Sequence, residues 1–138
     1  MIVAAVACGL HSFRRMTHAR IELGKTGEDL ACRELERRGY AIIARRYRTP
    51  RGEIDIVARD GPTLVFVEVK AREGREFGDG AEAVTPLKRR RITRLAQDYL
   101  ARQHVPECPC RFDVVSIHFD SGAPVIEVFK NAFDACDS

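Results

Sequence analysis

Two neighbouring apolar segments of the chain carry charged residues at positions where a buried β-strand normally has none. Glu53 and Asp55 lie in the segment GEIDIVA. Glu68 and Lys70 lie in the segment LVFVEVK. Burying a charge costs free energy unless the charge is paired or coordinates a metal ion. Three carboxylates and one lysine in such strands therefore indicate a site rather than a solvated face.

The residues between the two segments predict a tight turn, and hence a β-hairpin. The stretch Asp60–Thr63 reads DGPT and is rich in turn-forming residues. A hairpin centred in the middle of this stretch places Asp55 opposite Glu68. It also places Glu53 opposite Lys70, and strand alternation then points all four side chains to one face. Opposed Cβ atoms lie about 5 Å apart, so the four groups form one cluster at the end of the hairpin far from the turn.

The predicted cluster has the chemistry of a magnesium site. Asp55 and Glu68 are close enough in the hairpin to share a divalent cation, and Mg²⁺ is usually held by one or two carboxylates together with waters and substrate phosphates. Lys70 is placed to stabilise developing negative charge or to orient a water. The alternative is a structural group of ion pairs at a sheet edge. Two opposed carboxylates repel each other, however, unless something cationic lies between them.

The length and composition are those of one folded domain. The chain has 138 residues, of which 45% are hydrophobic and 31% charged, as in an ordinary soluble globular protein. We expect residues 1–17 to form a disordered N-terminal extension and residues 18–138 to form the domain. The apolar residues 1–10 are too few for a membrane span and lack the basic start of a signal peptide. We therefore expect a cytoplasmic protein without a membrane partner.

Two other kinds of site are excluded by residue spacing. The five cysteines are odd in number and lack the spacing of a disulfide framework, so free thiols are expected. Cys108 and Cys110 form a C-x-C, but no second cysteine pair or histidine cluster completes a zinc site. Gly24-Lys25-Thr26 resembles the end of a P-loop. Position 19 holds alanine where that motif needs glycine, and no strand precedes it, so nucleoside triphosphate binding is excluded.

The positive charges are gathered in two short stretches of the chain, although the net charge is only +3. A basic side on a nearly neutral molecule suits a polyanionic partner. The alternative is an ordinary solvated helix face. The residues concerned are Arg45, Arg46, Arg48 and Arg51 in the first stretch, and Lys88, Arg89, Arg90, Arg91 and Arg94 in the second.

Hydrophobic periodicity and turn residues predict the order helix, three strands, helix, two strands. The expected elements are a helix at 21–38, strands at 40–47, 53–59 and 63–71, a helix opened by Thr85 and Pro86, and strands at 112–119 and 125–130. Residues 71–84 leave directly from Lys70 and are expected to form a loop that folds over a substrate. Glu28 lies at the margin of the apolar stripe of the first helix. Its carboxylate reaches either solvent or the carboxylate cluster.

This order, with Asp55 on one strand and Glu68-Val69-Lys70 on the next, resembles the PD-(D/E)XK nuclease superfamily. The strings GEIDIVA, VFVEVKAR and AVTPLKRRRI are similar, more narrowly, to the YraN-type family of uncharacterised bacterial proteins, over about residues 18–133. The resemblance implies an α/β fold with a restriction-endonuclease-like αβββαβ core, in which helices flank a mixed central sheet. Where the superfamily has a proline before the aspartate, this chain has isoleucine. The proline is not a ligand, so its loss leaves the chemistry intact.

The resemblance also implies roles for individual residues. Asp55 and Glu68 would bind Mg²⁺ or Mn²⁺, with the backbone carbonyl of Val69 as a further ligand. Lys70 would position or activate the attacking water. Glu28 would correspond to the acid that some superfamily members carry on the first helix.

The substrate implied by the resemblance is a nucleic acid, either DNA or RNA. Lys88 and Arg91 at the start of the second helix, together with Arg51, are expected to hold backbone phosphates. None of these groups reads base sequence well, so structure-selective or weakly specific cleavage is expected. The resemblance is compatible with a homodimer. The alternatives are a non-catalytic nucleic-acid-binding module and a protein-interaction domain that retain the nuclease fold.

Overall fold

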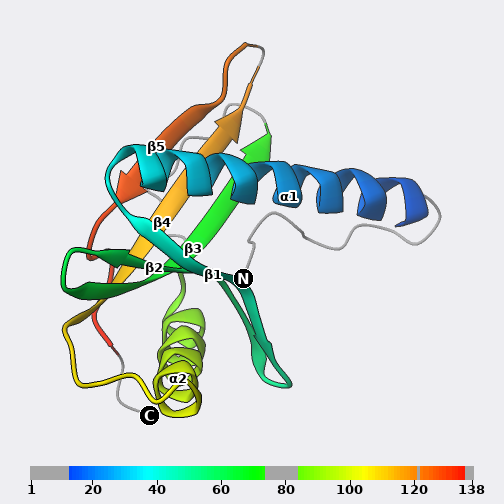
Figure 1. Ribbon diagram of the computed structural model, residues 1–138. Helices are drawn as coiled ribbons and strands as arrows, with labels where there is room; N and C mark the ends of the chain where they lie inside the picture. Colours follow the sequence, from blue (N-terminus) through cyan, green and yellow to red (C-terminus); the bar gives the residue numbers. More distant parts are fainter. Residues whose placement is uncertain (1–12, 74–83, 121, 136–138) are drawn as a thin grey trace.

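The computed structural model describes the backbone of residues 13–73, 84–120 and 122–135, and within these ranges the side chains from residue 25 onward. Two helices and five strands follow one another along the chain (Figure 1). They are α1 (Phe13–Arg37), β1 (Ala41–Thr49), β2 (Gly52–Asp60), β3 (Thr63–Glu73), α2 (Pro86–Arg102), β4 (Cys110–Phe119) and β5 (Val125–Phe129). The predicted element order is therefore confirmed.

The five strands form a single mixed sheet in the order β1-β2-β3-β4-β5. β3 and β4 run parallel, with α2 in the connection between them, whereas the other neighbouring strands are antiparallel. A parallel pair needs such a crossover because a tight turn can join only antiparallel strands. The mixed sheet with two helices is consistent with the restriction-endonuclease-like αβββαβ core, and the expected fold class is confirmed.

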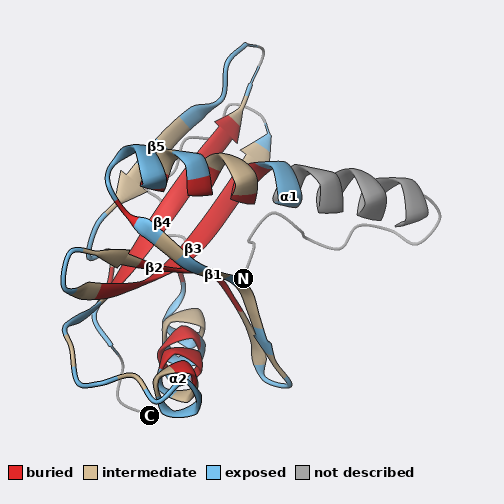
Figure 2. Cartoon of the chain, in the orientation of Figure 1, coloured by how far each residue is buried: buried red, intermediate tan, exposed pale blue. Residues whose placement is uncertain are grey.

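One hydrophobic cluster joins α1 to the sheet. Ala31 and Leu35 of the helix are fully buried against Val65, Val67 and Val69 of β3. The three valines alternate along the strand and so share one face. Figure 2 shows that β3 and β4 are buried over most of their length, as expected for central strands.

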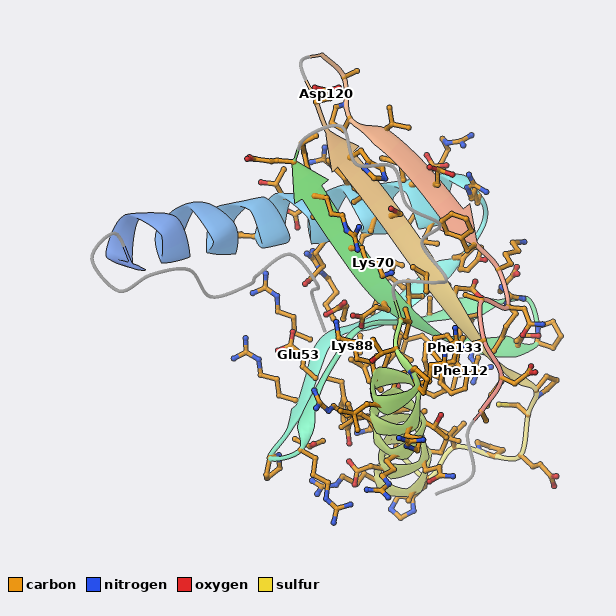
Figure 3. All side chains as sticks on the ribbon, turned by 180° about the vertical axis from the view of Figure 1, so that it is seen from behind. Glu53, Lys70, Lys88, Phe112, Asp120 and Phe133 are labelled. Atoms are coloured by element: carbon orange, nitrogen blue, oxygen red, sulfur yellow. The ribbon has the colours of Figure 1, made fainter. Side chains whose placement is uncertain are left out.

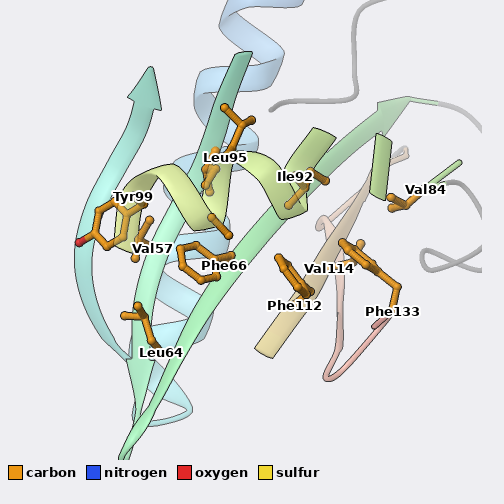
Figure 4. Close-up of a cluster of buried hydrophobic side chains, with 12 residues drawn as sticks. Val57, Leu64, Phe66, Val84, Ile92, Leu95, Tyr99, Phe112, Val114 and Phe133 are labelled. Carbon is orange, nitrogen blue, oxygen red and sulfur yellow. The ribbon is translucent and has the colours of Figure 1, made fainter. Parts of the chain in front are cut away.

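A second cluster joins α2 to the other residues of the same strands (Figure 4). Phe66 of β3 packs edge-on against Tyr99 of α2, with 5.9 Å between ring centroids. Leu64 and Leu95 are also buried in this cluster. By strand alternation the next residues on this face of β3 are Glu68 and Lys70. The α2 face of β3 is thus apolar up to Phe66 and charged beyond it.

Helix α2 begins as the sequence predicts. Thr85 is the N-cap, and its side chain accepts a hydrogen bond of 3.3 Å from the backbone N–H of Lys88. Pro86 occupies the first turn, where its missing N–H costs nothing. The cap fixes where the helix starts, and thereby places Lys88 beside the charged end of β3.

Helix α1 begins at Phe13 rather than at the expected residue 21. No glycine or proline lies between these positions, so the sequence contains nothing that would stop the helix there. The loop expected at 71–84 begins later than predicted, because β3 continues to Glu73. The expectations for residues 1–12 and 74–83 lie outside the described residues. Within the described ranges, no helix is long and apolar enough to cross a membrane.

Close packing of α1 on β3 depends on Gly27. A Cβ atom at this position would lie 2.7 Å from the Cβ of Ala71, closer than two such atoms approach. The absence of a side chain lets α1 approach the strand that carries Glu68 and Lys70. It also sets the position of Glu28, the next residue of the helix.

Candidate functional site

The site lies where strand β2 separates from β3. Their paired residues run from Asp60 opposite Thr63 to Ile56 opposite Val67, which confirms the register predicted for this part of the hairpin. The ladder ends at Ile56. The next residues are Asp55 on β2 and Glu68 on β3, so the two carboxylates stand at the opening of a fork.

The fork opens because the end of the β1–β2 hairpin turns toward α2. Ile56 packs in the α1 cluster, but Ile54, two residues away, packs in the α2 cluster. In a regular strand these two side chains would share a face. Across the hairpin, Arg46 has a φ of 54°, a left-handed conformation that breaks strand alternation. Tyr47 then also packs in the α2 cluster, against Tyr99.

Asp55 closes the fork with a side-chain hydrogen bond. Its Oδ2 accepts the backbone N–H of Val69 at 2.8 Å. A side-chain oxygen thus pairs with a donor of β3 beyond the point where the backbone ladder between the strands has ended. The neighbours of Val69 are Glu68 and Lys70, so this bond fixes Asp55 relative to both. All three charged residues are buried, with exposed fractions of 0%, 2% and 1% for Asp55, Glu68 and Lys70.

Burial makes the two carboxyl groups resist ionisation. It raises the pKa of Asp55 to about 6, and the negative charge of Glu53 acts in the same direction. Burial also raises the pKa of Glu68 well above its usual range, and the charge of Asp55 raises it further. The positive charge of Lys88 opposes this shift of the Glu68 pKa. Asp55 and Lys88 thus both act on the ionisation of Glu68, which places the three charged groups near one another.

Such a pair of carboxylates fits a divalent cation. A cation between Asp55 and Glu68 would offset the cost of burying both charges and the repulsion that Asp55 exerts on Glu68. Carboxylate and carbonyl oxygens are the ligands of Mg²⁺ and Mn²⁺. Within the part of the chain that the structure describes, no three His, Cys, Asp or Glu residues are grouped as metal ligands. The protein would therefore supply Asp55, Glu68 and the carbonyl of Val69, and leave other positions to water and substrate.

Glu53 has a different neighbour from the one predicted. The sequence places it opposite Lys70, but the β2–β3 ladder ends before it reaches this pair. Glu53 instead lies opposite Arg48 of β1, whose Nε donates to its Oε2 at 2.8 Å. The prediction failed here because it continued a regular hairpin through the fork. Figure 3 labels Glu53, Lys70 and Lys88 around the junction of the hairpin, β3 and the start of α2.

Glu28 is buried beneath two arginines of β1. Its side chain has no exposed surface, and its carboxylate accepts from Nε of Arg45 at 2.9 Å and from Nε of Arg46 at 3.2 and 3.1 Å. These ion pairs compensate the burial of an acid at the margin of an apolar stripe. The role of Glu28 as an acid of the metal site stays a prediction.

The predicted phosphate-binding residues gather at the edge of the fork. Arg91 and Arg51 are exposed, and Lys88 is half-buried. A Cβ atom on Gly52 would lie 3.4 Å from Cδ of Arg91, so the hairpin turn that carries Arg51 rests against α2 at Arg91. The loop of the β1–β2 hairpin and the start of α2 thus bring together cations that are far apart in the sequence.

Strand β4 adds two buried polar residues that sequence reasoning missed. Ser116 pairs with Lys70 in the β3–β4 register, and by alternation His118 lies on the same face. Both are buried, with 3.3 Å between Ser116 Oγ and His118 Nε2. The signal available was the alternation FDVVSIHF, in which polar residues replace apolar ones on one face of a strand.

A second network that sequence reasoning missed lies at the other end of the sheet. The buried carboxylate of Asp113 accepts from Tyr40 Oη at 2.8 Å and from Nε of Arg111 at 2.9 Å. Arg111 also binds Asp60 at 2.8 Å. Burial and the bond to Asp113 raise the pKa of Tyr40 above its usual range. The network ties the start of β4 to the β2–β3 turn.

Comparison with known proteins identifies the family of the chain. The model of the uncharacterised protein family UPF0102 matches residues 27–117, which include Glu28, Asp55, Glu68 and Lys70. A UPF0102 protein of Geobacter metallireducens is 49% identical over 112 residues, covering 81% of this chain and 92% of the relative. One of Symbiobacterium thermophilum is 49% identical over 114 residues, covering 82% and 97%. The chain therefore belongs to the uncharacterised protein family UPF0102.

Proposed function

We propose that this protein is a metal-dependent nuclease of the PD-(D/E)XK superfamily that hydrolyses phosphodiester bonds in DNA or RNA. The observation that supports the proposal most directly is the fork itself, where two buried carboxylates with raised pKa values stand just beyond the paired part of β2 and β3. The strand that carries Glu68 carries Lys70 two residues later, on the same face. This is the set of groups that the superfamily resemblance assigns to phosphodiester hydrolysis.

Each residue of the fork has a defined task in this chemistry. A bound Mg²⁺ or Mn²⁺ supplies an activated water and neutralises charge on the phosphate. Asp55 and Glu68 hold the ion, together with the carbonyl of Val69. The hydrogen bond from Val69 N–H to Asp55 keeps that carboxylate in position. Lys70 orients the attacking water and stabilises the negative charge that develops on the phosphate.

The cations beside the fork hold the rest of the substrate. Lys88 is close enough to Glu68 to affect its pKa, so a phosphate bound to Lys88 lies next to the reacting one. Arg91 and Arg51 extend this surface outward along α2 and the hairpin turn, and the N-terminus of α2 adds its own partial positive charge. These groups bind phosphate rather than bases. The proposal is therefore for structure-selective or weakly sequence-specific cleavage in the cytoplasm.

The alternative proposal is a nucleic-acid-binding module without catalysis. The buried carboxylates argue against it, because they weaken phosphate binding unless a cation occupies the fork. A protein-interaction domain is distinguished from both by salt dependence, since nucleic-acid binding weakens steeply as counterions are added.

The experiment that tests the proposal is cleavage of a panel of labelled single-stranded, duplex, flapped and four-way substrates with Mg²⁺ or Mn²⁺. Both DNA and RNA versions are needed. We expect cleavage of at least one substrate class, and none when EDTA removes the metal. If no substrate is cut but duplexes are bound in a salt-dependent way, the non-catalytic module replaces the nuclease. If nothing is bound, both proposals are wrong.

A further inference from the structure

Two consecutive arginines of β1 bind the same buried carboxylate. Side chains of neighbouring strand residues normally point to opposite faces, yet Arg45 and Arg46 both contact Glu28. The left-handed φ of 54° at Arg46 makes this possible. This conformation is unfavourable for any residue with a side chain. A strained residue in the middle of a strand points to a function for its side chain.

Arg46 occupies the strand position beside Asp55. Arg45 pairs with Ile56 and Tyr47 pairs with Ile54, so Arg46 lies opposite Asp55 in the β1–β2 hairpin. The strained residue is therefore at the level of the fork. Its guanidinium reaches back to Glu28 on α1, and so lies between that helix and the hairpin.

The two arginines differ in what their terminal amino groups bind. Arg45 is neutralised on both sides, because its Nε binds Glu28 and its Nη2 binds Asp29 at 2.6 Å. Arg46 contacts Glu28 only through Nε. Among the described residues its terminal amino groups have no hydrogen-bond partner, and its side chain is 37% exposed. Arg46 thus presents two amino groups to an incoming anion.

We propose that Arg46 binds a backbone phosphate of the nucleic acid at the fork, and that Glu28 is a positioning residue that holds Arg46 in place. The inference rests on the proposed function for its substrate. A guanidinium fixed through Nε keeps its terminal donors in the geometry that matches a phosphate. Glu28 then acts on the substrate through Arg46 rather than as a ligand of the metal.

The test compares matched variants in duplex binding. The variant Arg46→Asn removes the guanidinium, and asparagine tolerates the left-handed conformation. The control Arg45→Gln removes the neighbouring guanidinium that Asp29 already neutralises. Binding of a short fluorescein-labelled DNA duplex is followed by fluorescence anisotropy at several salt concentrations, with Ca²⁺ in place of Mg²⁺. Thermal unfolding of each variant shows that it is folded.

We expect Arg46→Asn to weaken duplex binding about tenfold. The slope of log K against log salt concentration should fall by the amount that corresponds to about one lost phosphate contact. Arg45→Gln should leave the slope unchanged. An unchanged slope in Arg46→Asn, with wild-type binding intact, overturns the role of Arg46 and leaves the nuclease proposal standing. A wild-type protein that binds no nucleic acid overturns both.

The positioning role of Glu28 is tested by Glu28→Gln, alone and combined with Arg46→Asn. We expect Glu28→Gln to weaken duplex binding in the wild-type background and to have no further effect beside Arg46→Asn, because residues that act as a unit are non-additive. Mn²⁺ affinity, measured by calorimetry without nucleic acid, should be unchanged. A large loss of Mn²⁺ affinity, or additive effects on duplex binding, would instead make Glu28 an independent member of the metal site.

Discussion

The backbone N–H of Val69 donates a 2.8 Å hydrogen bond to Oδ2 of Asp55 across the fork between β2 and β3. In a continuous ladder that donor would belong to a backbone bond. Because the carboxylate takes it instead, the strands can separate without leaving a buried donor unsatisfied. The same bond holds Asp55 at a fixed place beside Glu68. The opening of the sheet and the assembly of the site are thus one structural feature.

Metal-free protein should lose stability as the pH rises. The pKa of Asp55 in the folded protein is about 6, against about 3.9 in an unfolded chain. The folded state therefore holds more protons between these values, and the free energy of unfolding falls as the pH increases through this range. Glu68, whose pKa is also raised by burial, adds to the fall. Thermal unfolding in EDTA across this range measures the effect.

Bound metal should reverse this pH dependence, because it stabilises the ionised carboxylates. We expect the rise in Tm on adding Mg²⁺ or Mn²⁺ to be small near pH 4 and larger above about pH 6. In Asp55→Asn the metal-free Tm should vary less with pH, and the metal effect should be lost. A Tm rise that persists in this variant would place the bound metal elsewhere.

The cations of α2 should supply phosphate contacts without sequence preference. Replacing Lys88 and Arg91 by alanine should weaken duplex binding equally for different sequences and lower the salt slope by about two phosphates. The matched control replaces Arg37 and Arg38 of α1, which both bind Glu34. This double substitution changes the net charge by the same amount as the first. Equal losses in the two double variants would show that net charge, rather than this surface, binds the duplex.

Close packing at Gly27 should make an otherwise favourable substitution unfavourable. Alanine in place of glycine inside a helix normally stabilises by about 1 kcal/mol. Here the new Cβ would lie 2.7 Å from that of Ala71, and overpacking costs about 1–3 kcal/mol. We expect Gly27→Ala to lower the free energy of urea unfolding by about 1 kcal/mol.

A substitution at Ala71, the residue that contacts Gly27, provides the control for this prediction. Ala71→Gly removes the atom that Gly27→Ala would meet, so the double variant should recover part of the lost stability. If Gly27→Ala is more stable than the wild-type protein, α1 does not approach β3 as closely as described.

The Asp113 network should be a major contributor to stability. Asp113→Ala removes the buried carboxylate that accepts from Arg111 and Tyr40, while Arg111 keeps its ion pair with Asp60. We therefore expect a loss below the about 3–5 kcal/mol that leaving a buried charge unpaired costs. Tyr40→Phe removes a single hydroxyl hydrogen bond to the same carboxylate, and should cost about 1 kcal/mol. Urea unfolding of the two variants checks both values. Similar losses in the two would mean that the Arg111 pair contributes little.

The features that followed from the sequence are those fixed by neighbouring residues. The turn at Asp60–Thr63 and the alternation of the two strands determine the pairing of Ile56 with Val67, and both signals are local. Thr85 followed by Pro86 marks the start of α2 for the same reason. These local signals were enough to bring Asp55 and Glu68 together.

The features that did not follow depend on contacts between distant residues. Arginine gives no signal for a left-handed conformation, and Glu28, the partner of Arg46, lies on another element. The turn of the hairpin toward α2 could therefore not be predicted, nor could the new partner of Glu53. Tyr40 and Asp113 are likewise far apart in the chain, and only the folded sheet brings them into contact.

The most direct test of the metal-dependent nuclease is the cleavage rate of wild-type protein and of Glu68→Gln, at saturating Mn²⁺, on the best substrate of the panel. Glu68→Gln keeps the size of the side chain and removes the charge that we propose binds the metal. Wild-type protein should cleave, and the folded variant should cleave at least about a hundredfold more slowly. Even the loss of a residue that only supports a metal ligand lowers metal affinity or activity by about 10–100-fold. A folded Glu68→Gln that cleaves at the wild-type rate would contradict the assignment of the fork as the catalytic centre.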